Sequence, residues 1–205
     1  MADSVADRIV GAAERLIAKR GLDAVSLRAV NRAAGAKNAS AIQYHFKNRA
    51  GLVRAILEKH EVSVERRRHE LLDDYVARDV QDVRAIASAL VVPLAAELTT
   101  NGGTGYLQLI CDLYNRPDPN FDPAIIADEH SSMGRWRLLV VPLLSPEAVR
   151  LHRRFDALRF TASELARRGR TGRRDHQLFV SQLVDLVTAL LSAPVSDVTR
   201  DLLRA

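Results

Sequence analysis

The sequence predicts an all-α fold, with a three-helix helix-turn-helix domain in residues 1–50 and a larger helical domain in residues 51–205. Three observations support this prediction. Apolar residues recur at three- and four-residue spacing through most of the chain, which is the period of an amphipathic helix. Residues 24–48 contain two short helical patterns joined by a turn at Gly35. The first 50 residues also carry the whole excess of positive charge in the chain.

Each helix of the first domain has its own start or stop signal. The first helix is expected over residues 7–20, because its apolar residues share one face and Gly21 can end it. Ser26 can cap the second helix through its hydroxyl, and the glycine turn follows this helix. The third helix is expected to begin near Asn38 or Ala39. The residues expected to face inward from the three helices are Ile9, Ala13, Leu16, Ile17, Leu27, Val30, Ala34, Ala39, Ile42 and Phe46.

Helical patterns continue through the second domain. The predicted helices cover residues 49–77, 80–98, 106–114, 123–144, 146–168 and 174–191. The charged middle of the first of these, residues 61–70, is expected to be exposed, and Pro93 is expected to bend the second. Ser145 followed by Pro146 is a strong start signal for a helix. The proline-rich segment 115–123 cannot be helical throughout.

The distribution of charge indicates a surface for an anionic partner. Residues 1–50 hold nine Lys and Arg against four Asp and Glu, a net charge of +5, whereas residues 51–205 hold 21 of each kind. Such a concentration of positive charge suits a phosphate backbone, so together with the helix-turn-helix it favours DNA as the partner. The arginine-rich stretch 165–176 could be a second anionic contact, although such a stretch is more often a solvated turn.

The residues that would contact DNA follow from the helix-turn-helix pattern. In this motif the second helix lies in the major groove and neighbouring side chains hold phosphates. The residues expected to face base edges are Lys37, Asn38, Ser40 and Gln43. The residues expected to hold phosphates are Ser26, Arg28, Tyr44, His45, Lys47 and Arg49. A helical hairpin without a DNA-binding role would show the same bare pattern, so the order of the surrounding elements matters.

That order resembles the N-terminal domain of the tetracycline-repressor (TetR) family. The matching stretches are AAERLIAKRG (12–21), SLRAVNRAAG (26–35), YHF (44–46) and Arg49. In the family they correspond to a first helix that ends in glycine, a second helix capped by Ser or Thr, an Ala-Ala-Gly turn, an aromatic end of the recognition helix, and a basic residue. From Gly35 to Phe46 the chain holds one residue more than the commonest family spacing, which leaves two registers, one residue apart, for the base contacts.

The resemblance implies a DNA-binding transcriptional regulator, most simply a repressor, which leaves a palindromic operator when a small molecule binds the second domain. Binding would move the helix at 49–77, which links the two domains. The candidate cavity residues are mainly apolar, so the ligand is expected to be largely apolar, with His130 or a tyrosine hydroxyl fixing its polar end. These residues are Leu90, Leu94, Tyr106, Leu109, Cys111, Tyr114, Phe121, His130, Met133, Trp136 and Phe155.

The last two predicted long helices have apolar faces wider than one buried side of a monomer requires. The resemblance implies that they pair with their copies in a four-helix bundle, whose two-fold axis would present two recognition helices to the half-sites of a palindrome. The residues expected at this homodimer interface are Phe155, Leu158, Phe179, Leu183, Leu186, Val187 and Leu190. The alternative is that both helices close a monomeric core.

Other classes of protein have less support. The six histidines include no pair at the i, i+3 or i, i+4 spacing of metal ligands on a helix, so no metal or other cofactor is expected. An enzyme is disfavoured, because no G-x-S-x-G motif or strand framework is present. No apolar run approaches 18 residues, no signal segment leads the chain, and Cys111 is its one cysteine, which together favour the cytoplasm over a membrane. A helix-turn-helix architectural or interaction protein without ligand response is the alternative.

Overall fold

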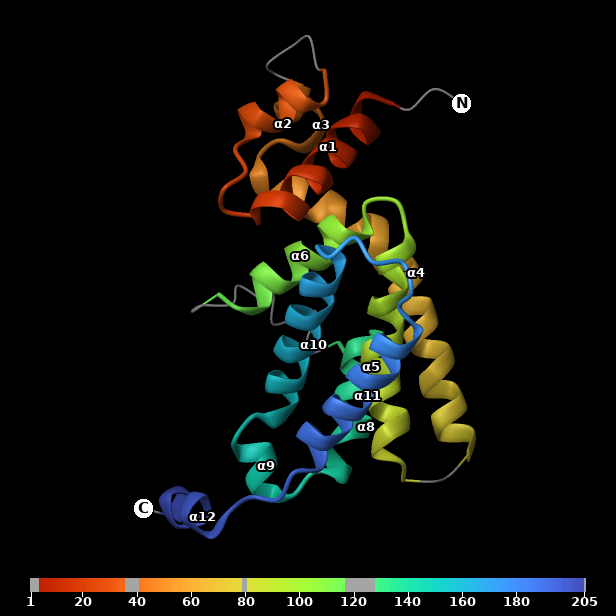
Figure 1. The fold of residues 1–205 in the computed structure, drawn as a ribbon, viewed down its shortest axis with the longest axis vertical. Helices are drawn as coiled ribbons and strands as arrows, with labels where there is room; N and C mark the ends of the chain where they lie inside the picture. Colours follow the sequence, from red (N-terminus) through yellow and green to blue (C-terminus); the bar gives the residue numbers. More distant parts are fainter. Residues whose placement is uncertain (1–3, 36–40, 79–80, 117–127, 205) are drawn as a thin grey trace.

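The computed structural model describes residues 4–35, 41–78, 81–116 and 128–204, and these residues form helices without strands, as predicted. The helix-turn-helix lies at one end of the molecule, and the C-terminus lies at the other end (Figure 1). The elements are α1 (Val5–Arg20), α2 (Leu27–Ala33), α3 (Ala41–Phe46), α4 (Arg49–Arg78), α5 (Val83–Ala95), η1 (Ala96–Thr99), α6 (Gly103–Tyr114), α8 (Ser132–Val140), η2 (Val141–Leu143), α9 (Pro146–Arg150), α10 (Arg153–Gly169), α11 (Gln177–Ser192) and α12 (Asp197–Arg204).

Local signals set the starts of the first two helices. Ser4 caps α1 in a capping box: the Asp7 amide donates to Ser4 Oγ, and the Ser4 amide donates to Asp7 Oδ2, both at 3.1 Å. Ser26 Oγ accepts the Ala29 amide at 3.2 Å and caps α2, as predicted. Gly35 has a φ of +63°, the left-handed conformation that a turn between the helices was expected to need.

The first of two apolar cores lies between α1, α2, α3 and the first turns of α4. Its most deeply buried large side chains, each with 2% exposure or less, include Ile9, Ile17, Val30, Ile42 and Ile56. Burial of each such side chain stabilises the fold by about 1.5 to 3 kcal/mol. Leu109 of α6 belongs to the same core, so the larger domain contributes to the packing of the helix-turn-helix domain.

The long helix α4 buries one side along its whole length. The buried residues recur every four positions: Leu52, Ile56, His60, Val64, Arg68 and Leu72. The prediction that residues 61–70 are exposed is therefore wrong for Val64 and Arg68. The reason is that α5 and α8 pack against this part of α4, and Arg68 finds hydrogen-bond partners there.

The helix predicted over 123–144 is shorter in the structure. Residues 128–131 form a turn, and α8 begins at Ser132 because Ser131 Oγ accepts the Gly134 amide at 3.0 Å. The helix ends in the short 3-10 helix η2. The beginning of the predicted range, 123–127, lies outside the described residues.

The helix predicted over 146–168 is two helices in the structure. Its predicted start is confirmed, because Ser145 Oγ accepts the Ala148 amide at 3.2 Å. The chain turns at Leu151 and His152, where His152 has a φ of +54°, and α10 begins after this turn. A non-glycine residue in the left-handed region is uncommon, so no local signal indicated the break.

The second apolar core lies among α4, α5, α6, α8, α10 and α11. Trp136 of α8 is 1% exposed, and its Nε1 donates to the carbonyl oxygen of Ile86 at 2.9 Å. Pro93 lies inside α5, and the chain passes into η1 three residues later.

The short α12 was not predicted. Among the described residues no single helix is long and apolar enough to span a membrane, and α11 with α12 passes that test only as a pair bent by 52°.

Candidate functional site

The outer face of the helix-turn-helix carries most of the residues expected to contact DNA. Ile42 of α3 is 2% exposed and faces the first core, so the opposite side of this short helix points outward. The predicted contact residues that are exposed are Ser26, Arg28, Gln43, Tyr44, His45 and Lys47. Tyr44 exposes 83% of its surface, which is unusual for a large aromatic side chain and suits a partner surface. Lys37, Asn38 and Ser40 lie outside the described residues.

Arg49 was also expected to hold a phosphate, and it has a structural role that the sequence analysis did not predict. Its half-buried guanidinium donates to the carbonyl oxygen of Val25 at 2.6 Å and to that of Leu22. The larger domain holds the same loop, because Asp112 of α6 accepts the Leu22 amide at 2.6 Å. The loop that leads into α2 is therefore fixed by α4 and α6 together.

Helix α6 lies directly against α1 (Figure 1). Gly105 permits this close approach, because a Cβ at that position would lie 2.3 Å from the backbone oxygen of Glu14. Just beyond the end of α6, Arg116 pairs with Asp23 of the loop before α2 at 2.8 Å. The larger domain thus contacts the helix-turn-helix domain through α6 as well as through the continuous helix α4.

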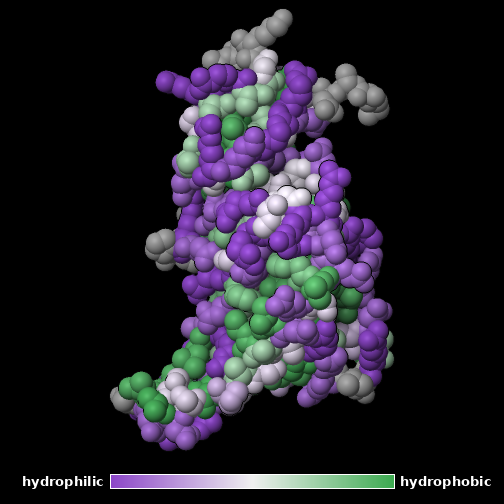
Figure 2. Space-filling model, in the orientation of Figure 1, coloured by the Kyte–Doolittle hydropathy of each residue, from purple (hydrophilic) through white to green (hydrophobic). Residues whose placement is uncertain are grey.

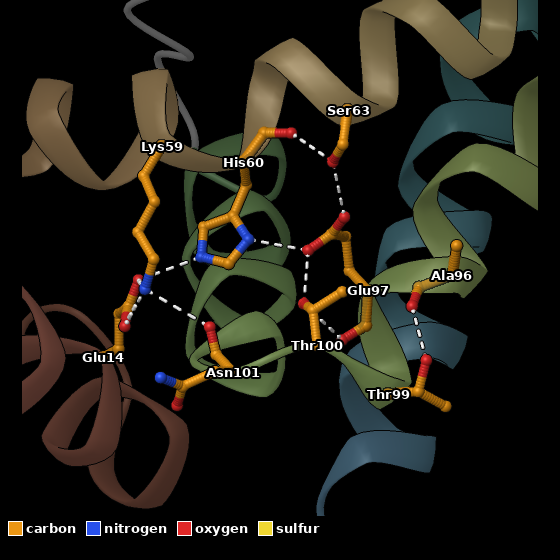
Figure 3. A network of polar contacts seen from close by, with 9 residues as sticks. All are labelled: Glu14, Lys59, His60, Ser63, Ala96, Glu97, Thr99, Thr100 and Asn101. Carbon is orange, nitrogen blue, oxygen red and sulfur yellow. Dashed lines mark hydrogen bonds and ion pairs between the residues drawn. The ribbon is translucent and has the colours of Figure 1, made fainter.

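A buried polar network joins α1, α4 and η1 (Figure 3). His60 of α4 lies between two carboxylates: its Nε2 is 2.9 Å from Glu14 of α1, and its Nδ1 is 2.6 Å from Glu97 of η1. All three residues are 4% exposed or less. Lys59 contacts both carboxylate oxygens of Glu14 at 2.8 Å. The network therefore connects the helix-turn-helix domain to the end of α5 through charged groups in a buried setting.

The two carboxylates favour the charged form of His60. Burial acts to lower the pKa of His60, but the hydrogen bonds and negative charges of Glu14 and Glu97 outweigh it and raise this pKa above 6.5. Burial acts to raise the pKa of Glu97, whereas hydrogen bonds from His60, Thr100 and Ser63 lower it below 4.5. His60 and its partners are therefore best described as an ion triad of one imidazolium and two carboxylates.

The contribution of this triad to stability should depend on pH in a definite direction. A raised pKa for His60 stabilises the folded state fully below about pH 6.5, and this contribution is lost as the pH rises through the folded pKa. A lowered pKa for Glu97 stabilises it above about pH 4.5, and this is lost as the pH falls. We therefore compare the free energies of unfolding of the wild type and of His60→Gln. The difference between them is expected to be smaller at about pH 8.5 than at about pH 6. Urea denaturation at the two pH values measures it, and a difference that grows would contradict a protonated His60.

Sequence reasoning missed the triad. His60 is 46 positions from Glu14 and 37 positions from Glu97 along the chain, so no local motif brings the three residues together. The one signal was the position of His60, four residues after the apolar Ile56 and four before Val64 on the same side of α4.

A cavity of about 420 Å³ lies in the larger domain, with walls from α4, α5, α6, α8 and α10. This volume is within the range of small-molecule sites. Six of the residues predicted to line a cavity do line it: Leu94, Tyr106, Tyr114, Met133, Trp136 and Phe155. The ring of Tyr106 stacks on His60 with 4.7 Å between centroids, so the cavity wall touches the polar network directly.

The other predicted cavity residues lie elsewhere. Leu90 and Leu109 are fully buried in the two apolar cores, and Cys111 is half-buried with its sulfur 3.8 Å from the Ser163 hydroxyl. The side chain of His130 is 99% exposed, because it belongs to the turn before α8, where it contacts Asp128. His130 therefore does not fix the polar end of a ligand in this cavity. Phe121 lies outside the described residues.

The cavity wall is more charged than the sequence analysis expected. The charged residues of its described wall are Glu61, Glu65, Arg68, Arg116, Arg137, Arg154 and Arg159. Arg68 is 2% exposed and donates to the Ala89 carbonyl oxygen at 3.2 Å and to Ser132 Oγ at 2.9 Å. Glu65 accepts the amide and the hydroxyl of Ser132 at 2.8 and 2.7 Å. Helical spacing could have put Arg68 on the buried side of α4, but nothing local identifies α8 as its partner.

Helix α11 has an apolar outer side. Leu178 and Leu186 expose 77% and 45% of their surfaces, and hydrophobic residues gather over α11 on the face shown in Figure 2. Of the residues expected at a dimer interface, Leu183 and Val187 need correction. They are 1% and 0% exposed and belong to the core of their own chain, against α5, so they offer no surface to a partner.

The remaining residues expected at the interface are only partly exposed. Phe155 and Leu158 line the cavity, and Phe179 and Leu190 pack on the edge of the second core. Within the arginine-rich stretch 165–176, Arg168 and Arg170 contact residues of the fold beyond α10. Arg168 donates from Nε to His176 Nδ1 at 3.2 Å, and Arg170 donates to Gln108 of α6 at 2.5 Å, so both secure the turn between α10 and α11.

The family comparison bears on the helix-turn-helix. Residues 9–56 match the model of a family described as bacterial regulatory proteins, tetR family. The matched residues run from α1 into α4 and contain the whole helix-turn-helix. No curated protein matches the chain. The match supports a DNA-binding transcriptional regulator.

Proposed function

We propose that this chain is a ligand-responsive repressor of the TetR family. A homodimer would bind a palindromic operator through its two helix-turn-helix domains, and a small, largely apolar molecule in the cavity would release it. The observation that carries this proposal is the position of Tyr106, which lines the cavity and stacks on His60 of the network that reaches α1. The cavity itself argues against a helix-turn-helix protein without ligand response.

Two helices can carry the effect of a ligand to the DNA-binding surface. In α4, Ile56 packs in the first core, whereas Val64 lines the cavity two turns later. In α6, Leu109 packs in the first core, and the next residue, Ile110, lines the cavity. A ligand that shifts either helix therefore acts on the helix-turn-helix domain, and in a dimer it changes the separation of the recognition helices. A coupling free energy of about 1 to 3 kcal/mol is typical between such sites.

The proposal is tested by finding the operator and then the response. Selection of bound duplexes from a random DNA library, with a footprint on the region upstream of the protein's own gene, identifies the operator. A compound that binds the cavity should weaken operator binding, and the operator should weaken binding of the compound by the same factor. Binding of all duplexes with equal affinity would remove the proposed function, whereas specific binding that no cavity ligand alters would favour the architectural alternative.

The assignment of base and phosphate contacts predicts two different losses. Gln43→Ala should cost about 1 to 3 kcal/mol at one base pair, because a glutamine on the outer face of α3 can pair with the edge of adenine. Lys47→Ala, the comparison variant, should weaken all DNA alike and lower the slope of log affinity against log salt by about one. Fluorescence anisotropy with operator, single-base operator variants and random duplexes measures both. An equal loss on operator and random DNA for Gln43→Ala would show that the recognition face is misassigned.

A further inference from the structure

Positive charge exceeds negative charge in the wall of the cavity. The described wall holds five arginines and two glutamates. Three of the arginines have partners: Arg116 pairs with Asp23, Arg159 lies 3.6 Å from Asp156, and Arg68 donates to Ser132 and to a backbone carbonyl. Within residues 4–35, 41–78, 81–116 and 128–204, no carboxylate lies within ion-pair distance of the other two, Arg137 of α8 and Arg154 of α10.

Arg154 is the clearer case of the two. Its Nε is buried from solvent and has no hydrogen-bond acceptor in the described part of the chain. Its guanidinium lies 5.3 Å from the ring centroid of Phe155, which also lines the cavity. A buried donor on a charged group costs free energy when it has no acceptor. A bound molecule that brings an acceptor into the cavity would remove this cost.

The two glutamates of the wall do not supply that acceptor. Glu65 already accepts two hydrogen bonds from Ser132. Glu61 also lines the cavity, and among the described residues it forms no ion pair with Arg137 or Arg154. Much of the remaining wall is apolar, with Leu94, Ile110, Trp136 and Leu158. The cavity therefore combines an apolar surface with two arginines whose charges are not balanced by a carboxylate of the described residues.

We infer that the cavity takes an organic anion, a molecule with an apolar body and one acidic group, and that Arg137 and Arg154 bind the acid. Guanidinium groups make short, charge-assisted hydrogen bonds to such acids and match their planar or tetrahedral oxygens. A neutral apolar molecule brings no anionic acceptor to either guanidinium group, and a cation is repelled by them. The inference rests on the proposed function, since it names the chemical class of the effector that would release the operator.

The test compares four probes with the same ten-carbon chain: decanoate, decyl sulfate, decan-1-ol and decylammonium. Trp136 is the one tryptophan of the chain and lines the cavity, so its fluorescence reports binding there. Calorimetry on the same samples gives an independent affinity. Both acids are expected to bind about tenfold or more tightly than the alcohol, and the ammonium compound least tightly. Decanoate and decyl sulfate together distinguish a carboxylate site from a sulfate- or phosphate-type site. Equal binding of alcohol and acids, tightest binding of the ammonium compound, or binding of none would overturn the inference.

Variants identify the groups responsible. Arg154→Gln and Arg137→Gln should each lower the affinity for the acids by about 10- to 100-fold and leave the affinity for the alcohol unchanged. Arg167→Gln is the matched control on α10, because Arg167 is exposed and pairs with Glu164 at 2.6 Å outside the cavity wall. Neither Arg137 nor Arg154 forms an ion pair within the described residues, so these variants are not expected to unfold the chain, and circular dichroism checks this for each of them. Unchanged acid affinity in both cavity variants would overturn the assignment.

A parallel titration with operator DNA separates this inference from the proposed function. If the chain binds no specific duplex, the proposed function fails, whatever the acids do. If it binds an operator but prefers the alcohol or the ammonium compound, the inference alone fails. If the acids bind through Arg137 and Arg154 and weaken operator binding, both are supported.

Discussion

Replacement of His60 by leucine is expected to destabilise the folded chain by about 3 to 5 kcal/mol. The leucine fills a similar volume, but it leaves Glu14 and Glu97, each 1% exposed, without the cation between them. Lys59 and Thr100 can satisfy some of the carboxylate oxygens, but they do not remove the repulsion between two buried negative charges. The free energy of unfolding from urea denaturation near neutral pH measures the loss.

Two comparisons make this result specific to the triad. His69→Leu is the same change on the same helix, but His69 is one third exposed and lies 3.8 Å from Glu65, so it should cost less than about 1 kcal/mol. Combining His60→Leu with Glu14→Leu and Glu97→Leu removes all three charges and should recover much of the loss, because apolar side chains often replace a buried ionic network without cost. A single His60→Leu variant as stable as the wild type would show that the triad does not hold the three elements together.

The same variants bear on regulation. If ligand effects pass from Tyr106 through His60 to α1, the triple leucine variant should fold, bind operator, and respond less to a cavity ligand. A full response in that variant would assign the coupling to α6 and its contacts with the loop before α2 instead.

The features that the sequence predicted correctly depend on residues close together in the chain. Ser26 and Ser145 cap helices through an amide three positions later, and Gly35 supplies a backbone conformation of its own. The outward direction of Gln43 and Tyr44 follows from the helical period once Ile42 is known to face inward. Local physics is sufficient for these, and the family resemblance rests on the same stretches.

The features that the sequence did not predict depend on which helices pack together. The partners of His60 come from α1 and η1, and Ser132, the partner of Arg68, begins a helix 64 positions away. His130 was expected in the cavity because the helix predicted over 123–144 included it, whereas in the structure it lies in the turn before α8 and is exposed to solvent. Leu183 and Val187 were expected at an interface because the sequence does not show which apolar side of α11 packs against α5. In the structure α5 covers the side that carries these two residues. Helical periodicity gives the faces of a helix but not the neighbour of each face.

The packing of α11 on α5 limits which side of α11 can pair with a second copy. If α11 pairs with its copy in a homodimer, the interface uses the outer side of the helix, where Leu178 and Leu186 are exposed, and not the side that faces α5. Leu186→Glu should therefore leave the core of each chain intact and still break the dimer. An unpaired carboxylate in a desolvated apolar interface costs several kcal/mol, and the two-fold axis introduces it twice.

Loss of the dimer should remove most of the operator affinity, because a single helix-turn-helix domain reads one half-site without the gain of a linked second contact. That gain is about 10²- to 10⁴-fold in typical bivalent binding, so Leu186→Glu is expected to weaken operator binding by a factor in that range. Val62→Glu is the matched control, since Val62 is an apolar residue of a different helix, α4, and is 74% exposed. Sedimentation velocity at micromolar concentration and operator titrations measure both variants beside the wild type. A wild-type chain that sediments as a monomer, or a Leu186→Glu dimer with full operator affinity, would contradict the assembly proposed here and leave the apolar side of α11 unexplained by self-association.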